Sequence, residues 1–130
     1  MRNIKTYEIF SGHKITNSLK KDFMKFNKNL SDLMVAIING EMKKFNELVD
    51  SVDIEEVDFE GNTSLLLASS NGRLKMMKEL LKRNANIHHK NNNGEDFHDL
   101  ASNRYKFINL TREYIEKQFP EFIAAKKYNL

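Results

Sequence analysis

The 130-residue sequence predicts an all-α solenoid of stacked helix–turn–helix units joined by short turns. Three observations support this fold class. Several residue types recur together 32 or 33 positions apart, as in Gly61 and Gly94, or in Ala36, Ala68 and Ala101. Apolar residues within each period fall at helical spacing, and Gly, Asn or Thr stands where a helix should begin or end. A repeat of this length determines the fold, because each unit buries its apolar face against its neighbours.

The central unit, residues 58–90, carries this pattern most completely. Gly61 supplies a turn with positive φ, and the Thr63 hydroxyl can cap the helix that follows. Gly72 should end that helix, and Asn84 should end the next one in the left-handed conformation. The first helix is expected to face the neighbouring units through Leu65, Leu67 and Ala68. The second helix has an apolar stripe of Leu74, Met77, Leu80 and Leu81.

This turn, helix, helix and loop unit resembles the ankyrin repeat. The family pattern Gly-x-Thr-Pro-Leu-His-x-Ala is matched by Gly61, Thr63, Leu65 and Ala68, with Ser64 at the Pro position and Leu66 at the His position. The family's Gly-Ala-Asp-apolar-Asn segment is matched loosely by residues 84–88. The resemblance implies two to three repeats over about residues 29–118. It also implies turn tips that project to one side, above a concave groove lined by the first helices.

The two flanking units depart from this pattern. The first, residues 31–57, is one residue short, so an irregular connection into the next turn is expected. The third, residues 91–118, has Tyr105 at the usual Gly position and His98 where the family normally has a buried Leu. The third unit is therefore expected to be a terminal cap with a modified face.

Capping segments are assigned to both ends of the stack. Periodicity predicts an amphipathic helix within residues 15–30, which would cover the N-terminal end. Pro120 should end the helix of the third unit, and residues 119–130 should form a C-terminal helix or tail. Residues 15–130 are thus expected to be one domain, preceded by a basic segment, residues 1–14, of undecided structure. The apolar residues that support the two end helices are Leu19, Phe23, Phe26, Phe122 and Ile123.

The first ten residues also resemble a known type of leader. Their pattern of Met-basic-x-Ile-Lys-x-aromatic-Glu-x-Phe is similar to the start of many proteins of large tailed phages. That resemblance implies a segment that directs a protein into a forming phage head. It supports an alternative function, a structural or packaged protein of a phage or another assembly, with targeting carried by the basic N-terminal segment.

Charge is distributed unevenly along the chain. Residues 1–30 hold seven Lys or Arg and two Asp or Glu. Residues 31–70 hold two basic and nine acidic residues, and residues 71–130 hold twelve basic and seven acidic residues. A nucleic-acid backbone would be attracted by both ends and repelled by the centre, so nucleic-acid binding is not expected. The acidic run at residues 50–60 is either a solvated turn or a binding surface, and the sequence leaves both open.

Several function classes are excluded by what the sequence lacks. Without Cys there is no disulfide, thiolate metal site or cysteine nucleophile. His88 and His89 point in different directions on regular structure, so no metal or other cofactor is expected. His98 beside Asp96 and Asp99 is interpreted as a hydrogen-bonded structural residue, since a terminal repeat offers no obvious cleft. An enzyme is therefore not predicted.

The sequence also shows no targeting signal for a membrane or for secretion. No apolar run approaches the roughly 18 residues that a membrane span requires, and no signal peptide is visible. A cytoplasmic location is expected, which would be the host cytoplasm for a viral protein.

We therefore predict a non-enzymatic protein–protein interaction module, a small adaptor or inhibitor. The resemblance places the candidate partner-binding residues at turn tips and groove positions. They are Asp58, Phe59, Glu60, Asn62, Asn92, Asn93 and Glu95 at the tips, and Ser70, Asn71, Asn103 and Arg104 in the groove. Phe59 is either a binding anchor or a residue packed against Val57 or the neighbouring turn. The expected partner is another protein with a basic surface, and the sequence leaves the oligomeric state open.

Overall fold

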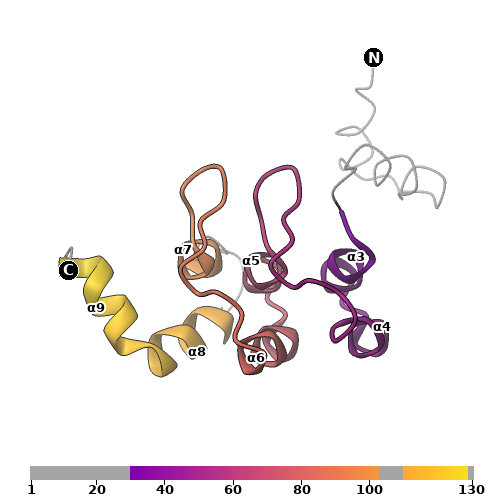
Figure 1. The fold of residues 1–130 in the computed structure, drawn as a ribbon. Coiled ribbons are helices and arrows are strands. Elements are labelled where there is room, and N and C mark those ends of the chain that lie inside the picture. The colour runs from indigo at the N-terminus through magenta and orange to yellow at the C-terminus, as the bar shows by residue number, and fades with distance from the viewer. Residues whose placement is uncertain (1–29, 103–109, 129–130) are drawn as a thin grey trace, which may run out of the picture.

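The computed structural model describes residues 30–102 and 110–128 of the chain (Figure 1). Within these ranges all regular structure is helical, which confirms the predicted all-α class. The helices are α3 (Asp32–Asn39), α4 (Met42–Leu48), α5 (Ser64–Ser70), α6 (Leu74–Lys82), α7 (Phe97–Ser102), α8 (Leu110–Gln118) and α9 (Pro120–Tyr128). The leader at residues 1–14, most of the capping segment at residues 15–30 and the modified position Tyr105 lie outside the described residues.

The helices pair in chain order and the pairs stack side by side. Helices α3, α5 and α7 form one row, and α4, α6 and α8 form a second row beside it (Figure 1). Helix α5 packs between α3 and α7, while α6 contacts α8. The two long loops, residues 49–63 and 83–96, project to the same side of the first row. This arrangement is the predicted solenoid of stacked units.

Local signals define the helix ends, and two of them, at Thr63 and Asn84, were predicted from the sequence. The Thr63 hydroxyl accepts a hydrogen bond from the Leu66 amide at 3.4 Å, and Ser31 caps α3 through the Met34 amide. Each bond satisfies an amide that has no partner inside its helix. Asn84, which follows α6, has φ +61°, the left-handed conformation expected of it.

The core is apolar and runs through all three helix pairs. Its largest fully buried side chains include Leu33, Ile37, Phe45, Leu65, Leu66, Met77, Leu80, Phe97 and Ile115. The predicted stripe of α6 needs a correction, since Leu74 and Leu81 are only half-buried whereas Met76 is buried. Helix α6 packs against both α5 and α8, and its inner face is therefore centred on Met76, Met77 and Leu80.

The C-terminal helix covers the end of the stack. Helix α8 ends at Gln118 and α9 begins at Pro120, so the proline occupies the first helical position. Phe97 of α7 meets the ring of Phe119 edge-on at 5.9 Å and that of Phe122 at 5.6 Å. Phe122 and Ile123 pack on the core but remain half-buried, so the predicted burial of this helix is partial.

Candidate interaction surfaces

The two long loops end in turns of the same geometry, 33 residues apart. In the first turn, the Asp58 amide donates to the Asn62 carbonyl, and the Gly61 amide donates to the Asp58 carbonyl, both at 3.0 Å. In the second turn, Asn91 stands in the place of Asp58 and makes the same two backbone bonds with Glu95 and Gly94 at 2.9 Å. The repeat therefore extends to the hydrogen bonds that close each turn.

One side-chain oxygen stabilises each turn from inside. The Asp58 Oδ1 atom accepts hydrogen bonds from the Glu60 and Asn62 amides at 2.9 Å. The Asn91 Oδ1 atom does the same for Asn93 at 3.0 Å and for Glu95 at 2.9 Å. These bonds fix the turn backbone before any partner arrives, which lowers the entropy lost on binding.

Two of the predicted contact residues are buried. Asp58 is only 4% exposed and Asn62 only 8%, because their side chains point into the turn and not toward solvent. The Asn62 Oδ1 atom accepts a hydrogen bond from Asn91 Nδ2 at 2.9 Å. We therefore assign Asp58 and Asn62 to the framework of the turns and leave them out of the proposed surface.

Hydrogen bonds also join the second turn to the first. The Asn92 amide donates to the Glu60 carbonyl at 2.9 Å, and Asn92 Nδ2 donates to the Phe59 carbonyl at 3.1 Å. His89 Nε2 donates to the Gly61 carbonyl at 2.8 Å. Sequence reasoning missed this bridging role of His89 and Asn92, because the repeat period marks equivalent positions and not the contacts between successive units.

Phe59 lies at the tip of this fixed turn with its side chain in solvent. Its exposed fraction is 62%, high for a large aromatic residue, and its neighbour Val57 is 36% exposed. The Phe59 carbonyl is held by Asn92, while the ring is outside the buried core. The structure thus places a rigid backbone beneath an exposed aromatic side chain.

The acidic run at residues 50–60 is used largely for internal contacts. Asp50 Oδ1 pairs with Arg83 Nε at 2.7 Å, and that hydrogen bond holds the Asp50 pKa below its ordinary value. Glu55 Oε2 accepts a hydrogen bond from the Asn86 amide at 3.0 Å. Among residues 30–102 and 110–128, the carboxylates of Glu56 and Glu60 have neither a hydrogen bond nor an ion pair. These two are the acidic side chains best placed to meet a partner.

The predicted groove residues divide between described and undescribed parts of the chain. Ser70 and Asn71 are half-buried at the end of α5, where Asn71 Nδ2 donates to the Leu67 carbonyl at 2.8 Å. The Ser70 hydroxyl donates to the same carbonyl at 3.3 Å. Both side chains therefore help to close the helix end, and Asn103 and Arg104 lie outside the described residues.

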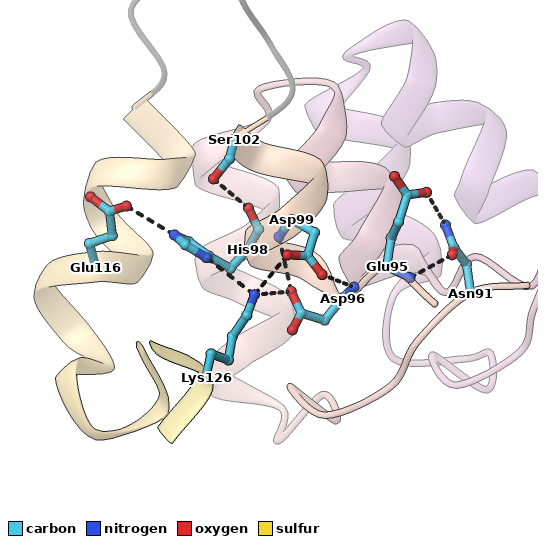
Figure 2. Close-up of polar contacts among 8 residues, drawn as sticks. All are labelled: Asn91, Glu95, Asp96, His98, Asp99, Ser102, Glu116 and Lys126. Atoms are coloured by element: carbon cyan, nitrogen blue, oxygen red, sulfur yellow. Dashed lines mark hydrogen bonds and ion pairs between the residues drawn. The ribbon is translucent and has the colours of Figure 1, made fainter. Parts of the chain in front are cut away.

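A polar cluster holds α9 against the third unit (Figure 2). The Lys126 Nζ atom donates to Asp99 Oδ1 at 2.8 Å, to Asp96 Oδ1 at 3.1 Å and to His98 Nδ1 at 3.4 Å. On the other side of its ring, His98 Nε2 donates to Glu116 Oε2 of α8 at 2.9 Å. His98 is thus a hydrogen-bonded residue that joins three helices.

Opposing effects act on the ionisation of this cluster. Burial disfavours the charged form of Asp99, but hydrogen bonds from Lys126 and the Asp96 amide outweigh it and lower the Asp99 pKa. Burial likewise opposes the charge of Lys126, yet its bonds to Asp99 and Asp96 raise the Lys126 pKa. Both partners are therefore charged at neutral pH.

The structure corrects the expectation that the terminal repeat offers no cleft. A hollow of about 800 Å3 lies between the second long loop and α9, bordered by residues of the polar cluster. Its lining includes Ile87, His88, Phe119, Phe122 and Lys126. The described residues of this lining include no Ser, Thr, Cys or Tyr, and the described part of the chain contains no group of three or more side chains suited to a metal ion.

The fold and the turn geometry together define a helical repeat protein whose successive turns are linked by hydrogen bonds. Residues 7–91, more than half of the chain, match the sequence model of a family described as "Ankyrin repeats (3 copies)". The chain belongs to the ankyrin-repeat family. The match begins N-terminal to residue 29, where the sequence placed the start of the resemblance, and ends as the third unit begins.

One curated relative is also similar to this chain. Alpha-latroinsectotoxin-Lt1a from Latrodectus tredecimguttatus is 32% identical to it over 90 residues. The alignment covers 65% of this chain but only 6% of the toxin, so the chain spans a small fraction of that relative's length. Ankyrin repeats are generally protein–protein interaction modules and are typically non-enzymatic. Within residues 30–102 and 110–128, no helix is long and apolar enough to cross a membrane.

Proposed function

We propose that this chain is a small adaptor or inhibitor that binds one partner protein through the tips of its two long loops. The observation that carries the proposal is Phe59, an exposed aromatic side chain on a turn whose backbone is already held by hydrogen bonds. Aromatic residues on preorganised backbones are frequent anchors of protein interfaces, since little entropy is lost when they are buried.

The charge around Phe59 favours a partner with a basic surface. The exposed carboxylates of Glu56 and Glu60 lie on the same loop as the ring. Asn92 and Asn93 extend the exposed polar surface onto the neighbouring turn. A partner with an apolar pocket rimmed by Lys or Arg would match both the ring and the charges.

Affinity capture from lysate of the native source or its host tests this proposal. Wild type is compared with Phe59→Ala, with Glu60→Lys, and with Leu110→Ala as a matched control, because Leu110 is 55% exposed on a different element. The proposal expects one specific protein that is retained by wild type and Leu110→Ala. That protein should be depleted about tenfold or more by Phe59→Ala and, because the charge is reversed, by Glu60→Lys.

Two results of the capture experiment would contradict the proposal. A partner captured equally by Phe59→Ala and Glu60→Lys does not use the loop tips. A deletion variant lacking residues 1–14 separates the packaging alternative, because the adaptor proposal expects capture to persist without that segment. Loss of capture on this deletion alone would assign the function to the N-terminal segment.

A further inference from the structure

The hollow beside α9 combines aromatic walls with an excess of negative charge. Phe119 and Phe122 line it, and the His88 ring lies 5.5 Å from that of Phe122. Its charged lining residues are three carboxylates, Asp96, Asp99 and Glu121, and two ammonium groups, Lys90 and Lys126. A site with this lining attracts cations, and its rings can contact an apolar stem.

Asp96 contributes a buried carboxylate whose bonding is incomplete. Its side chain is 5% exposed, and its Oδ1 atom accepts bonds from the Asp99 amide at 2.9 Å and from Lys126. Within the described ranges, the second oxygen, Oδ2, has no hydrogen bond, and no dashed line reaches it in Figure 2. Buried carboxylate oxygens in folded proteins normally have a donor, so Asp96, which lines the hollow, can accept one more hydrogen bond.

The chain itself shows which chemical group fits beside Asp96. The ammonium of Lys126 lies between the carboxylates of Asp96 and Asp99, and 5.6 Å from the centre of the Phe122 ring. This distance is within the range of a cation–π interaction. Lys126 is thus an internal ammonium ion that neutralises only part of the negative charge and leaves Asp96 Oδ2 without a donor.

We propose that this hollow binds an organic cation, an ammonium or guanidinium group on an apolar stem, with Asp96 Oδ2 as the acceptor and Phe122 against the stem. The cation can come from a Lys or Arg side chain of a polypeptide or from a free polyamine. The site is separate from the Phe59 surface and does not depend on it. Lys126 competes for the same carboxylates and therefore weakens the binding.

Two-dimensional NMR titrations of the full chain test this site. The probes are spermidine, as a free polyamine, and N-acetyl-lysine methylamide, as a polypeptide side chain. N-acetyl-norleucine methylamide has a similar stem without the charge and serves as the matched neutral probe. The expected result is saturable shifts of residues that line the hollow with at least one cation, and at least about tenfold weaker binding of the neutral probe.

Two substitutions should change the affinity in opposite directions. Asp96→Asn removes the charge but keeps a side-chain oxygen that can cap α7, and it should weaken cation binding about tenfold. Lys126→Met removes the internal competitor and should strengthen binding severalfold. Glu56→Gln removes an acidic charge on the first long loop and should leave the affinity unchanged, as should Phe59→Ala.

Two results with the probes would overturn the proposal. One is equal affinity for the norleucine and lysine derivatives, and the other is no saturable shift with either cation.

The variants give a second test. Unchanged cation affinity in folded Asp96→Asn would also overturn the proposal. If Asp96→Asn unfolds before it can be titrated, Phe122→Leu is titrated in its place, and unchanged cation affinity in Phe122→Leu would contradict the role of the Phe122 ring. Tighter binding of spermidine than of the lysine derivative identifies a free polyamine as the source, and the reverse identifies a side chain.

Discussion

The central and the C-terminal units share one framework but are stabilised differently. In the central unit, Leu65 and Leu66 of α5 are fully buried. The positions 33 residues later hold His98 and Asp99, which are partly exposed and form hydrogen bonds or ion pairs with α8 and α9. The same backbone position is thus apolar where another unit follows and polar where the stack ends.

This difference shows how a repeat stack can be closed. An apolar face must be covered by a further helix pair, because it cannot remain in water without loss of stability. A polar face needs less cover, since single groups such as Lys126 can form ion pairs with its carboxylates. Ion pairs therefore replace part of the close packing in the terminal unit, and a hollow remains beside α9, which covers it.

The largest expected effect is loss of core packing in the central unit. Leu65→Ala and Leu80→Ala each remove a fully buried side chain and should lower the free energy of unfolding by about 2–5 kcal/mol. Leu81→Ala should lower the free energy of unfolding by clearly less, because Leu81 is only half-buried. Urea denaturation followed by circular dichroism measures all three variants. Unfolding midpoints within error of wild type for Leu65→Ala and Leu80→Ala would disprove the stacked core.

The two turns provide a matched pair of glycine substitutions. Gly61 and Gly94 have φ of +81° and +76°, so alanine should cost about 1 kcal/mol at either position. At Gly61 the added Cβ would also lie 2.5 Å from Asn92 Oδ1 and 3.0 Å from the Asn92 amide nitrogen, whereas at Gly94 nothing lies within 4 Å.

Gly61→Ala should therefore be the more destabilising of the pair, by about 1 kcal/mol or more, because the turn-to-turn contact must shift. Thermal unfolding of the two variants in the same buffer measures the difference. Equal destabilisation by Gly61→Ala and Gly94→Ala would mean that Asn92 of the second turn does not contact the first turn closely in solution.

Acid should release the C-terminal helix before it affects the central unit. The Asp99 pKa is below its ordinary 3.8, so its stabilising effect is complete above that value and is lost as pH falls through the lower folded value. Lys126 has a raised pKa and remains charged throughout this range. Hydrogen exchange of α9 amides should therefore accelerate below about pH 4 relative to α5 amides.

Lys126→Met provides the control for the acid effect. Without the ammonium, α9 should already exchange faster at neutral pH, and acid should add little further acceleration. A variant that retains the full acid response would assign that response to groups other than the Lys126 ion pairs.

The smallest expected effect is that of Phe59→Ala. Its ring is 62% exposed and lies outside the core, so the free energy of unfolding should change by no more than about 0.5 kcal/mol. A thermal melt beside Leu65→Ala measures the contrast. A loss comparable to that of Leu65→Ala would place Phe59 in the packing of the protein and remove it from the proposed surface.

Much of the fold could be predicted because its signals are local. The Thr63 cap, the left-handed Asn84 and the 33-residue spacing of Gly61 and Gly94 each depend on a few neighbouring residues. The apolar stripe of α6 was predicted less accurately, because the periodicity of an isolated helix does not show that α6 packs against both α5 and α8. Phe59 and Glu60 are exposed, as the proposed surface requires, but the burial of Asp58 could not be inferred from a polar residue in a turn.

The class of fold, the order of the helices and the positions of the turns follow from the amino-acid sequence alone, because spacing, caps and glycines act within one unit. Which polar groups are internal depends on how the elements pack in three dimensions. Asn91 joins Asn62 across the turns, and Lys126 reaches Asp96 from 30 residues away. Such contacts arise when separate elements stack, and the satisfaction of buried polar groups selects them. The polar groups that a partner can contact are those that such internal hydrogen bonds leave exposed.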